Sequence, residues 1–362
     1  MPSYVVGTVD SVLEARPGLQ RVLVALGDGR ERTERAYVLT KLTGTVDVGD
    51  RVVVNTTAVE LGLGTGGWHI VHWNLERSEW HEPGPGHVLK MRYTSLQVDV
   101  GSAEEHAPHL ADLESIDGMP VVGAALHSQL PGIAVALKHA RPDVRIAYVM
   151  TDAAALPLAV SDLVAALADR KLLDVTITCG QAFGGDYEAV TVYSALAVAR
   201  HVADADAAIV VMGPGIVGTG TRLGFSGIEL GPILDAAAGL GGVPIACLRA
   251  SFADPRTRHC GVSHHAVTAL TTGCRSRVLV ALPAVGGEAE ARLRADLAGA
   301  GIDARHDVVA IDTPDVLGLF AAHGLDVSSM GRPAAADPIL FQAAAAAGTL
   351  AAQRASRTAA AP

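Results

Sequence analysis

A glycine-rich segment, Gly213–Thr221, holds the residues whose types and spacing most clearly suggest chemistry. It follows an apolar, β-branched run, Ala207–Val211, that is typical of a buried parallel strand. Glycine lets backbone N–H groups approach a ligand closely, and threonine hydroxyls add hydrogen-bond donors without charge. Such loops at the carboxyl end of a strand commonly bind phosphate. The residues predicted to bind an anion here are Gly213, Gly215, Gly218, Thr219, Gly220 and Thr221.

The spacing of Gly213, Gly215 and Gly218 also matches the fingerprint of dinucleotide-binding proteins. Two features argue against a nicotinamide cofactor. The segment follows the fourth predicted strand of its domain, with no helix directly behind it. The next predicted strand ends at Arg249, where an acidic residue would be expected to bind the ribose. Contact with a phosphate or nucleotide and a purely structural turn both remain open.

A compact cationic run, Arg256, Arg258 and His259, follows the next strand and precedes His264 and His265. Guanidinium groups bind phosphate and carboxylate through paired hydrogen bonds, so Arg256 and Arg258 are predicted to clamp an anion. A solvated surface loop is the alternative interpretation. Because His264 and His265 are adjacent on a predicted helix, one of the two is expected to be structural.

Two histidines are the predicted general acid–base residues, because imidazole titrates near neutral pH. They are His127, at the end of the first strand of the second domain, and His264. Three carboxylates that also follow predicted strands, Asp152, Asp186 and Asp254, would orient these histidines or carry a metal.

A second glycine-rich loop contributes Gln181 to the predicted binding residues. We expect this loop to lead into a helix over Asp186–Val202, so a capping role for Asp186 competes with a catalytic one. Cys179 stands at the end of the preceding strand as an alternative nucleophile, although free cysteines more often behave as small buried hydrophobes.

Imidazole and carboxylate groups together also suit a zinc, manganese or iron ion. The metal-ligand candidates are His127, Asp152, Asp254, His259 and His264. The sequence contains no closely spaced ligand motif, so a divalent metal depends on these residues converging in the fold. A magnesium ion bound through a substrate phosphate would leave still less trace in the sequence.

These candidates all follow apolar runs that alternate with helical segments, which predicts a mainly parallel sheet. The carboxyl ends of parallel strands form one edge, where open α/β sheets bind their ligands. The predicted fold class is α/β, a doubly wound sheet preceded by a small β-barrel. The predicted domains are an all-β barrel over 1–100, with a hairpin turn at Asp28-Gly29, a Rossmann-like domain over 118–341, and an alanine-rich tail over 342–362.

The composition narrows the classes of partner. The chain has 362 residues and a formal charge of −10, which argues against a nucleic-acid-binding surface. No long apolar run predicts a membrane span, and the first residues lack the features of a signal peptide, so a cytoplasmic location is expected. Four widely spaced cysteines argue against a disulfide framework.

Four motifs together resemble an uncharacterised bacterial family. They are Ala125–Gly132, Gly180–Asp186, Met212–Thr221, and Ser251–Asp254 with Ser263–His265. Members of that family are of similar length, are known chiefly from actinobacteria and bacilli, and are classed as a domain of unknown function. The resemblance covers nearly the whole chain and implies no activity.

The function that the residues favour is an enzyme, a transferase or hydrolase, that binds a phosphorylated or nucleotide-like metabolite. Two alternatives stay open: a metabolite sensor without catalytic activity and a metal-dependent hydrolase. The expected partner is an anionic small molecule, with neither nucleic acid nor membrane, and a homo-oligomer is left open.

Overall fold

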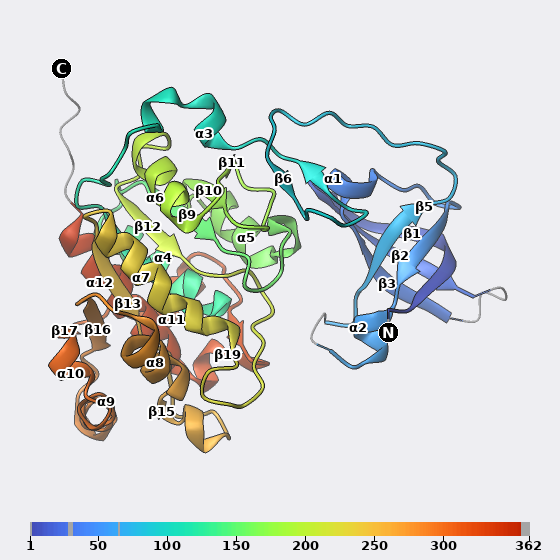
Figure 1. The fold of residues 1–362 in the computed structure, drawn as a ribbon. Helices are drawn as coiled ribbons and strands as arrows, with labels where there is room; N and C mark the ends of the chain where they lie inside the picture. The colour runs from blue at the N-terminus through green and yellow to red at the C-terminus, as the bar shows by residue number, and fades with distance from the viewer. Residues whose placement is uncertain (1, 28–31, 64–65, 356–362) are drawn as a thin grey trace. The chain divides into compact units, whose positions relative to one another are not determined.

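The computed structural model describes residues 2–27, 32–63 and 66–355. The chain divides into two compact units, Met1–Gly101 and Ser102–Pro362 (Figure 1). The α/β fold class and the N-terminal barrel are both confirmed. No helix in the described ranges is long and apolar enough to cross a membrane.

Five strands close the barrel of the first unit in the order β1-β2-β3-β5-β4. They are β1 (Tyr4–Arg16), β2 (Leu19–Leu26), β3 (Arg32–Val38), β4 (Arg51–Asn55) and β5 (His69–Asn74), accompanied by α1 (Thr40–Thr43), α2 (Thr57–Glu60), β6 (Leu89–Lys90) and β7 (Val98–Asp99). Alternate side chains face inward, and Val22, Val24, Val52 and Val54 are buried there. The predicted Asp28-Gly29 turn lies outside the described residues.

An eight-stranded, all-parallel sheet forms the centre of the second unit, in the order β11-β10-β9-β12-β8-β13-β16-β17. Its strands are β8 (Pro120–Gly123), β9 (Ile146–Met150), β10 (Val175–Thr178), β11 (Tyr187–Glu188), β12 (Ala207–Val210), β13 (Val243–Cys247), β16 (Leu279–Pro283) and β17 (Asp307–Ile311). The apolar runs that alternate with helical segments form this sheet, as expected, and the short strand β11 lies at its edge. The first strand, β8, therefore lies in the middle of the sheet, between β12 and β13.

Helices cover both faces of the sheet (Figure 1). On one face a continuous core joins the sheet mainly to α4 (Leu130–Ala140), α5 (Asp162–Asp169), α11 (Val316–Ala322) and α12 (Pro338–Arg354). The other face packs against α6 (Val192–His201), α7 (Leu230–Gly239), α8 (His264–Thr268) and α9 (Gly287–Gly299). Smaller elements of this unit are α3 (Ala103–His106), α10 (Ile302–Arg305), β14 (Ala250–Ser251), β15 (Gly261–Val262), β18 (Ser328–Ser329) and β19 (Arg332–Pro333).

The alanine-rich segment that begins at Gln342 forms most of α12, a helix packed inside the core. Small residues let this helix approach α4 very closely. A Cβ atom on Gly132 would lie 2.8 Å from the Cβ of Ala344, and one on Gly348 would lie 2.2 Å from the carbonyl oxygen of Ile133. The alanines that suggested a tail are thus core residues chosen for close helix packing.

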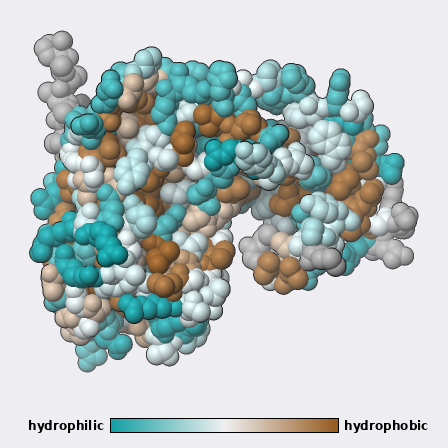
Figure 2. All heavy atoms as spheres, in the orientation of Figure 1, coloured by the Kyte–Doolittle hydropathy of each residue, from teal (hydrophilic) through white to brown (hydrophobic). Residues whose placement is uncertain are grey.

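Hydrophobic and hydrophilic residues are interspersed on the face of the molecule that Figure 2 shows. The exposed large hydrophobic side chains include Leu61 in the first unit and Val217 and Leu223 in the second. Scattered exposed apolar residues are normal on a protein surface, so they carry no functional argument by themselves. The search for a site therefore turns to cavities.

Candidate anion-binding site

Loops that follow three neighbouring strands, β12, β8 and β13, surround two cavities at the carboxyl edge of the sheet. The smaller cavity has a volume of about 150 Å³ and the larger about 530 Å³. Ile216 and Met330 line both of them. We call the smaller one the anion cavity; its lining residues are Ile216, Val217, Gly218, Gly220, Arg249, Arg256, Arg258, His259, His265 and Met330.

Arg249 is the most informative residue of the anion cavity, because its side chain is buried without a carboxylate partner. The residue is only 4% exposed. Among the described residues its guanidinium forms one hydrogen bond, in which Nη1 donates to Nδ1 of His265 at 2.8 Å. Burial lowers the pKa of Arg249 to about 10, so the group stays charged at neutral pH. The charge of Asp254 favours the charged guanidinium, whereas burial and the charges of Arg256, Arg332 and Arg258 oppose it. A bound anion would offset this cost.

The hydrogen bond from Arg249 determines which ring nitrogen of His265 carries the proton. Arginine has only donors, so Nδ1 of His265 must accept, and the neutral ring carries its proton on Nε2. Burial and the neighbouring Arg249 lower the pKa of His265 to about 3, which keeps the ring neutral. The ring also stacks on Phe225, with centroids 3.8 Å apart. His265 therefore offers an N–H donor at a fixed position.

Two further arginines line the same cavity. Arg256 forms a paired interaction with the buried Asp254, with Nε and Nη2 at 2.9 and 2.7 Å from the two carboxylate oxygens. The hydrogen bonds from Arg256 hold the pKa of Asp254 well below its usual range. Arg258 lies beside Gly220, where a Cβ atom would be 3.5 Å from its Nη1. Asp254 thus positions one cation, and Arg258 stands next to the glycine-rich segment.

The glycine-rich segment forms a hairpin that is one wall of the anion cavity, rather than a loop that opens a helix. Thr219 N donates to the carbonyl of Gly224 at 2.8 Å, and the hydroxyls of Thr219 and Thr221 lie 2.9 Å apart. Gly220 has φ +81°, a conformation that favours glycine. The N–H groups of Gly218 and Gly220 donate no hydrogen bond within the described residues. The threonine hydroxyls are engaged in the turn, which leaves backbone N–H groups as the available donors.

Three histidines cluster here, of which His259 and His265 line the anion cavity and His264 does not. Nitrogen atoms of His259, His264 and His265 lie within 4.8 Å of one another. Nε2 of His264 is buried and has no hydrogen-bond partner in the described part of the chain. Burial, followed by the charge of Arg258, lowers the pKa of His264. Three imidazoles could hold a metal ion, but the proton on Nε2 of His265 and the adjacent arginines favour an anion instead.

His127 lies in the wall of the larger cavity, where both of its ring nitrogens are engaged. Nδ1 lies 3.1 Å from the carbonyl oxygen of Met212, and Nε2 lies 2.7 Å from the hydroxyl of Ser161. The Ser161 hydroxyl also accepts the N–H of Val164, where it caps α5. Burial lowers the pKa of His127 to about 4. Both nitrogens of this neutral ring form hydrogen bonds, one to the loop after β12 and one to the start of α5. Neither nitrogen is left to bind a ligand.

The remaining predicted residues lie after β9 and β10, on the far side of β12 from Arg249. Asp152 accepts the N–H of Gln181 at 2.8 Å, and Asp186 accepts both the N–H and the hydroxyl of Thr176. The expected helix at Asp186 begins only at Val192, because the loop first adds β11 to the edge of the sheet. The contacts of these residues hold the loops after β9 and β10 and the edge of the sheet. None of the three, Asp152, Asp186 and Gln181, lines the anion cavity.

Two glycines at the start of the glycine-rich segment lie outside the anion cavity. Gly213 is buried, and a Cβ atom there would lie 2.7 Å from the carbonyl oxygen of Ala155, so this glycine permits close packing. Gly215 lines the larger cavity together with His127. Both positions lie in the glycine-rich segment but outside the anion cavity.

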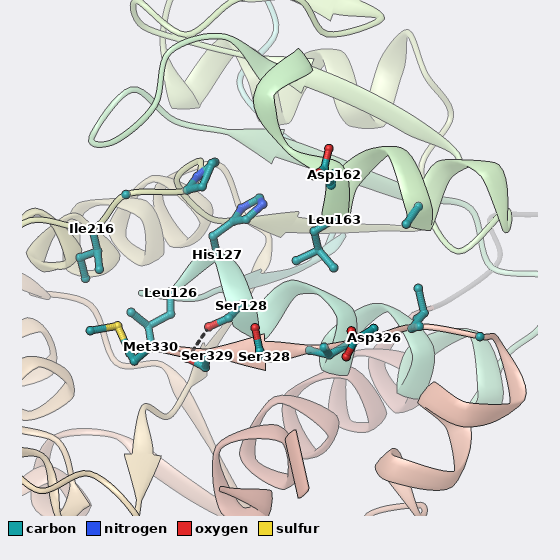
Figure 3. A pocket seen from close by; sticks show the side chains of 16 residues that line it. Leu126, His127, Ser128, Asp162, Leu163, Ile216, Asp326, Ser328, Ser329 and Met330 are labelled. Carbon is teal, nitrogen blue, oxygen red and sulfur yellow. Dashed lines mark hydrogen bonds between the residues drawn. The ribbon is translucent and has the colours of Figure 1, made fainter. Parts of the chain in front are cut away.

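The larger cavity, which we call the apolar pocket, extends from Ile216 and Met330 toward Asp326 (Figure 3). Its wall includes Leu126 from the loop after β8 and Leu163 from α5. The polar residues in its wall are His127, Ser128, Asp162, Asp326, Ser328 and Ser329. The hydroxyls of Ser128 and Ser329 lie 2.8 Å apart and are joined by a hydrogen bond (Figure 3).

Sequence reasoning missed Arg249, His265 and Met330 as lining residues. The position of Arg249 directly after an apolar strand could have identified it as a site residue. In the sequence, Arg249 served only as evidence that the strand does not end in an acid that binds ribose. His265 could not be chosen over His264 without knowing how the helix is rotated. Met330 comes from a late segment with no motif.

A family model described as a protein of unknown function, DUF3866, matches residues 35–348. No curated protein matched the chain, and no solved structure did. The match spans part of the barrel and nearly all of the second unit, including every residue of both cavities. The chain therefore belongs to the DUF3866 family of proteins of unknown function.

Proposed function

We propose that this protein binds a phosphorylated small molecule, with the phosphate held in the anion cavity. The observation that carries the proposal is Arg249, a buried guanidinium with no carboxylate partner among the described residues. The N–H of His265, the side chain of Arg258 and the backbone of Gly218 and Gly220 supply further donors around the same small volume. Phosphate suits this arrangement because its oxygens accept several charge-assisted hydrogen bonds at once.

The same arrangement supports phosphoryl chemistry, that of a transferase or hydrolase. Arginines around a phosphate stabilise the charge that develops on the equatorial oxygens during transfer. His264 is the acid–base candidate, because its buried Nε2 has no partner and its ring lies 4.9 Å from that of His259. His127 takes no part in this scheme, because both of its ring nitrogens are engaged.

Isothermal titration with inorganic phosphate tests the binding proposal. The wild-type chain should bind one phosphate, and Arg249→Met should weaken binding by about a hundredfold or more, since it removes a buried charge-assisted interaction. Arg277→Met is the matched control, because Arg277 pairs with Asp307 at the opposite edge of the sheet. Absence of saturable binding to wild type, or equal binding to both variants, would refute the proposal.

Turnover separates the enzyme from the sensor. An enzyme should hydrolyse 4-nitrophenyl phosphate, or transfer its phosphoryl group to an added alcohol, and His264→Gln should lower the rate while phosphate still binds. Phosphate binding with no turnover of this aryl ester in the wild-type chain would favour the metabolite sensor.

A further inference from the structure

The anion cavity and the apolar pocket adjoin each other. Ile216 and Met330 contribute to the walls of both cavities. In the view of Figure 3, these two side chains lie together at one end of the apolar pocket, and Asp326 lies toward the other end. These two side chains form the wall that the cavities share, and a molecule held by its phosphate at Arg249 would pass them to reach a space of about 530 Å³. Pockets of this size bury small organic ligands.

The chemistry of the walls changes along this path. The anion cavity has three arginines, whereas the apolar pocket contains no lysine or arginine in its wall. The apolar contacts of the pocket come from Leu126, Leu163, Ala166, Leu325 and Val327. Its charged side chains are the two carboxylates Asp162 and Asp326. The two ends of the combined site thus carry opposite charge.

We infer that the ligand is a phosphomonoester whose single phosphate sits at Arg249 and whose uncharged, mainly apolar body fills the pocket beside Leu163 and Ala166. This inference rests on the proposed function and adds the class of ligand. Apolar walls favour a hydrocarbon or ring. Asp162 and Asp326 are both exposed, so they disfavour a second anionic group at the far end only modestly, because solvent screens the repulsion.

A series of ligands tests this assignment of the phosphate to the anion cavity and of the apolar body to the apolar pocket. Titration of the full chain should show hexyl phosphate binding at least about tenfold more tightly than inorganic phosphate, since several methylene groups leave water. Hexane-1,6-diol bisphosphate should bind more weakly than hexyl phosphate at low salt, because its second phosphate would approach the two carboxylates. Hexanoate should compete more weakly than hexyl phosphate, because it presents fewer oxygens and less charge to the arginines.

Two variants on one helix locate the body of the ligand. Ala166→Phe should fill the pocket and abolish the advantage of hexyl phosphate while leaving inorganic phosphate binding unchanged. Ala165→Phe is the matched control, because the neighbouring Ala165 does not line either cavity. Leu163→Ala supplies a second test that adds no bulk, and it should reduce the hexyl advantage about threefold to tenfold.

The outcomes separate the two proposals. If inorganic phosphate fails to bind wild type, the proposed function is wrong and this inference falls with it. If phosphate binds but the hexyl chain brings no gain, or if Ala166→Phe weakens both ligands equally, the inference is overturned while the proposed function stands. Equal or tighter binding of the bisphosphate would likewise overturn the assigned ligand class.

Discussion

Nη1 of Arg249 lies 2.8 Å from Nδ1 of His265, and this hydrogen bond fixes the proton of the imidazole on Nε2. This one contact therefore determines whether His265 is a hydrogen-bond donor or acceptor at Nε2. It makes Nε2 of His265 an N–H donor, which suits the proposed anion and does not suit a metal ion. The other N–H groups of this buried guanidinium have no partner among the described residues, and in the proposed function the phosphate accepts hydrogen bonds from them.

Replacement of Arg249 should separate stability from binding. Arg249→Met removes a buried charge that forms no ion pair with a carboxylate in the described part of the chain, so the free energy of unfolding without ligand should fall by no more than about 1 kcal/mol and should rise if the methionine packs well. Urea denaturation in a phosphate-free, sulfate-free buffer measures this. By contrast, Asp254→Asn leaves Arg256 without its paired carboxylate, and because Arg256 is partly exposed this should destabilise the protein by about 1 to 2 kcal/mol. A larger loss for Arg249→Met than for Asp254→Asn would show that Arg249 is a structural residue.

Sulfate binding should become tighter as the pH falls from about 8 to about 6. Sulfate keeps its charge over this range, and a bound dianion offsets the arginines that lower the pKa of His264. The pKa of His264 should therefore rise on binding, so the complex takes up protons and acid favours it. Titration calorimetry in two buffers with different ionisation enthalpies measures the uptake. His264→Gln should lose most of this dependence; an unchanged dependence would place the proton elsewhere.

The protein should lose stability in mild acid, partly through His127. Burial lowers the pKa of His127 from 6.5 to about 4, so between these values the unfolded chain binds a proton that the folded chain does not. Stability is therefore lost as the pH falls through this window, by about 2 kcal/mol for this residue between pH 7 and pH 5. Urea denaturation at both pH values should show a smaller loss in His127→Gln. The same loss in both proteins would contradict the buried, neutral state of His127.

The histidine cluster should not retain zinc. Coordination by Nε2 of His265 would require loss of the hydrogen bond from Arg249, and a dication would lie close to several arginines. Protein purified without a histidine tag and dialysed should contain less than about 0.1 zinc per chain by elemental analysis. One tightly held zinc that disappears in both His259→Gln and His264→Gln would support the metal-dependent hydrolase instead.

Much of the fold follows from local patterns in the sequence. Apolar, β-branched runs such as Ala207–Val211 predict the strands, and the segments between them predict the helices, because burial and periodicity are local properties. The position of α12 does not follow in this way. Its alanines look like a low-complexity sequence. Only the contact between Gly132 of α4 and α12, and between Gly348 of α12 and α4, shows that they permit close helix packing.

The candidate site could be predicted only to the level of the sheet edge. Every predicted residue follows a strand, but the order of the strands decides which residues meet. Because β8 lies between β12 and β13, the glycine-rich segment reaches Arg256 and Arg258, whereas Asp152 and Asp186 follow β9 and β10 on the other side. Strand order depends on contacts between distant segments, which one sequence does not display.

A crystal of this protein soaked in selenate tests the central claim most directly, because the anomalous signal of selenium locates the anion. Selenate should occupy the anion cavity, within hydrogen-bond distance of the guanidinium of Arg249 and of Nε2 of His265, and it should be absent from crystals of Arg249→Met. Selenate bound only at other positions, or bound equally in the variant, would contradict the assignment of this cavity as the anion site.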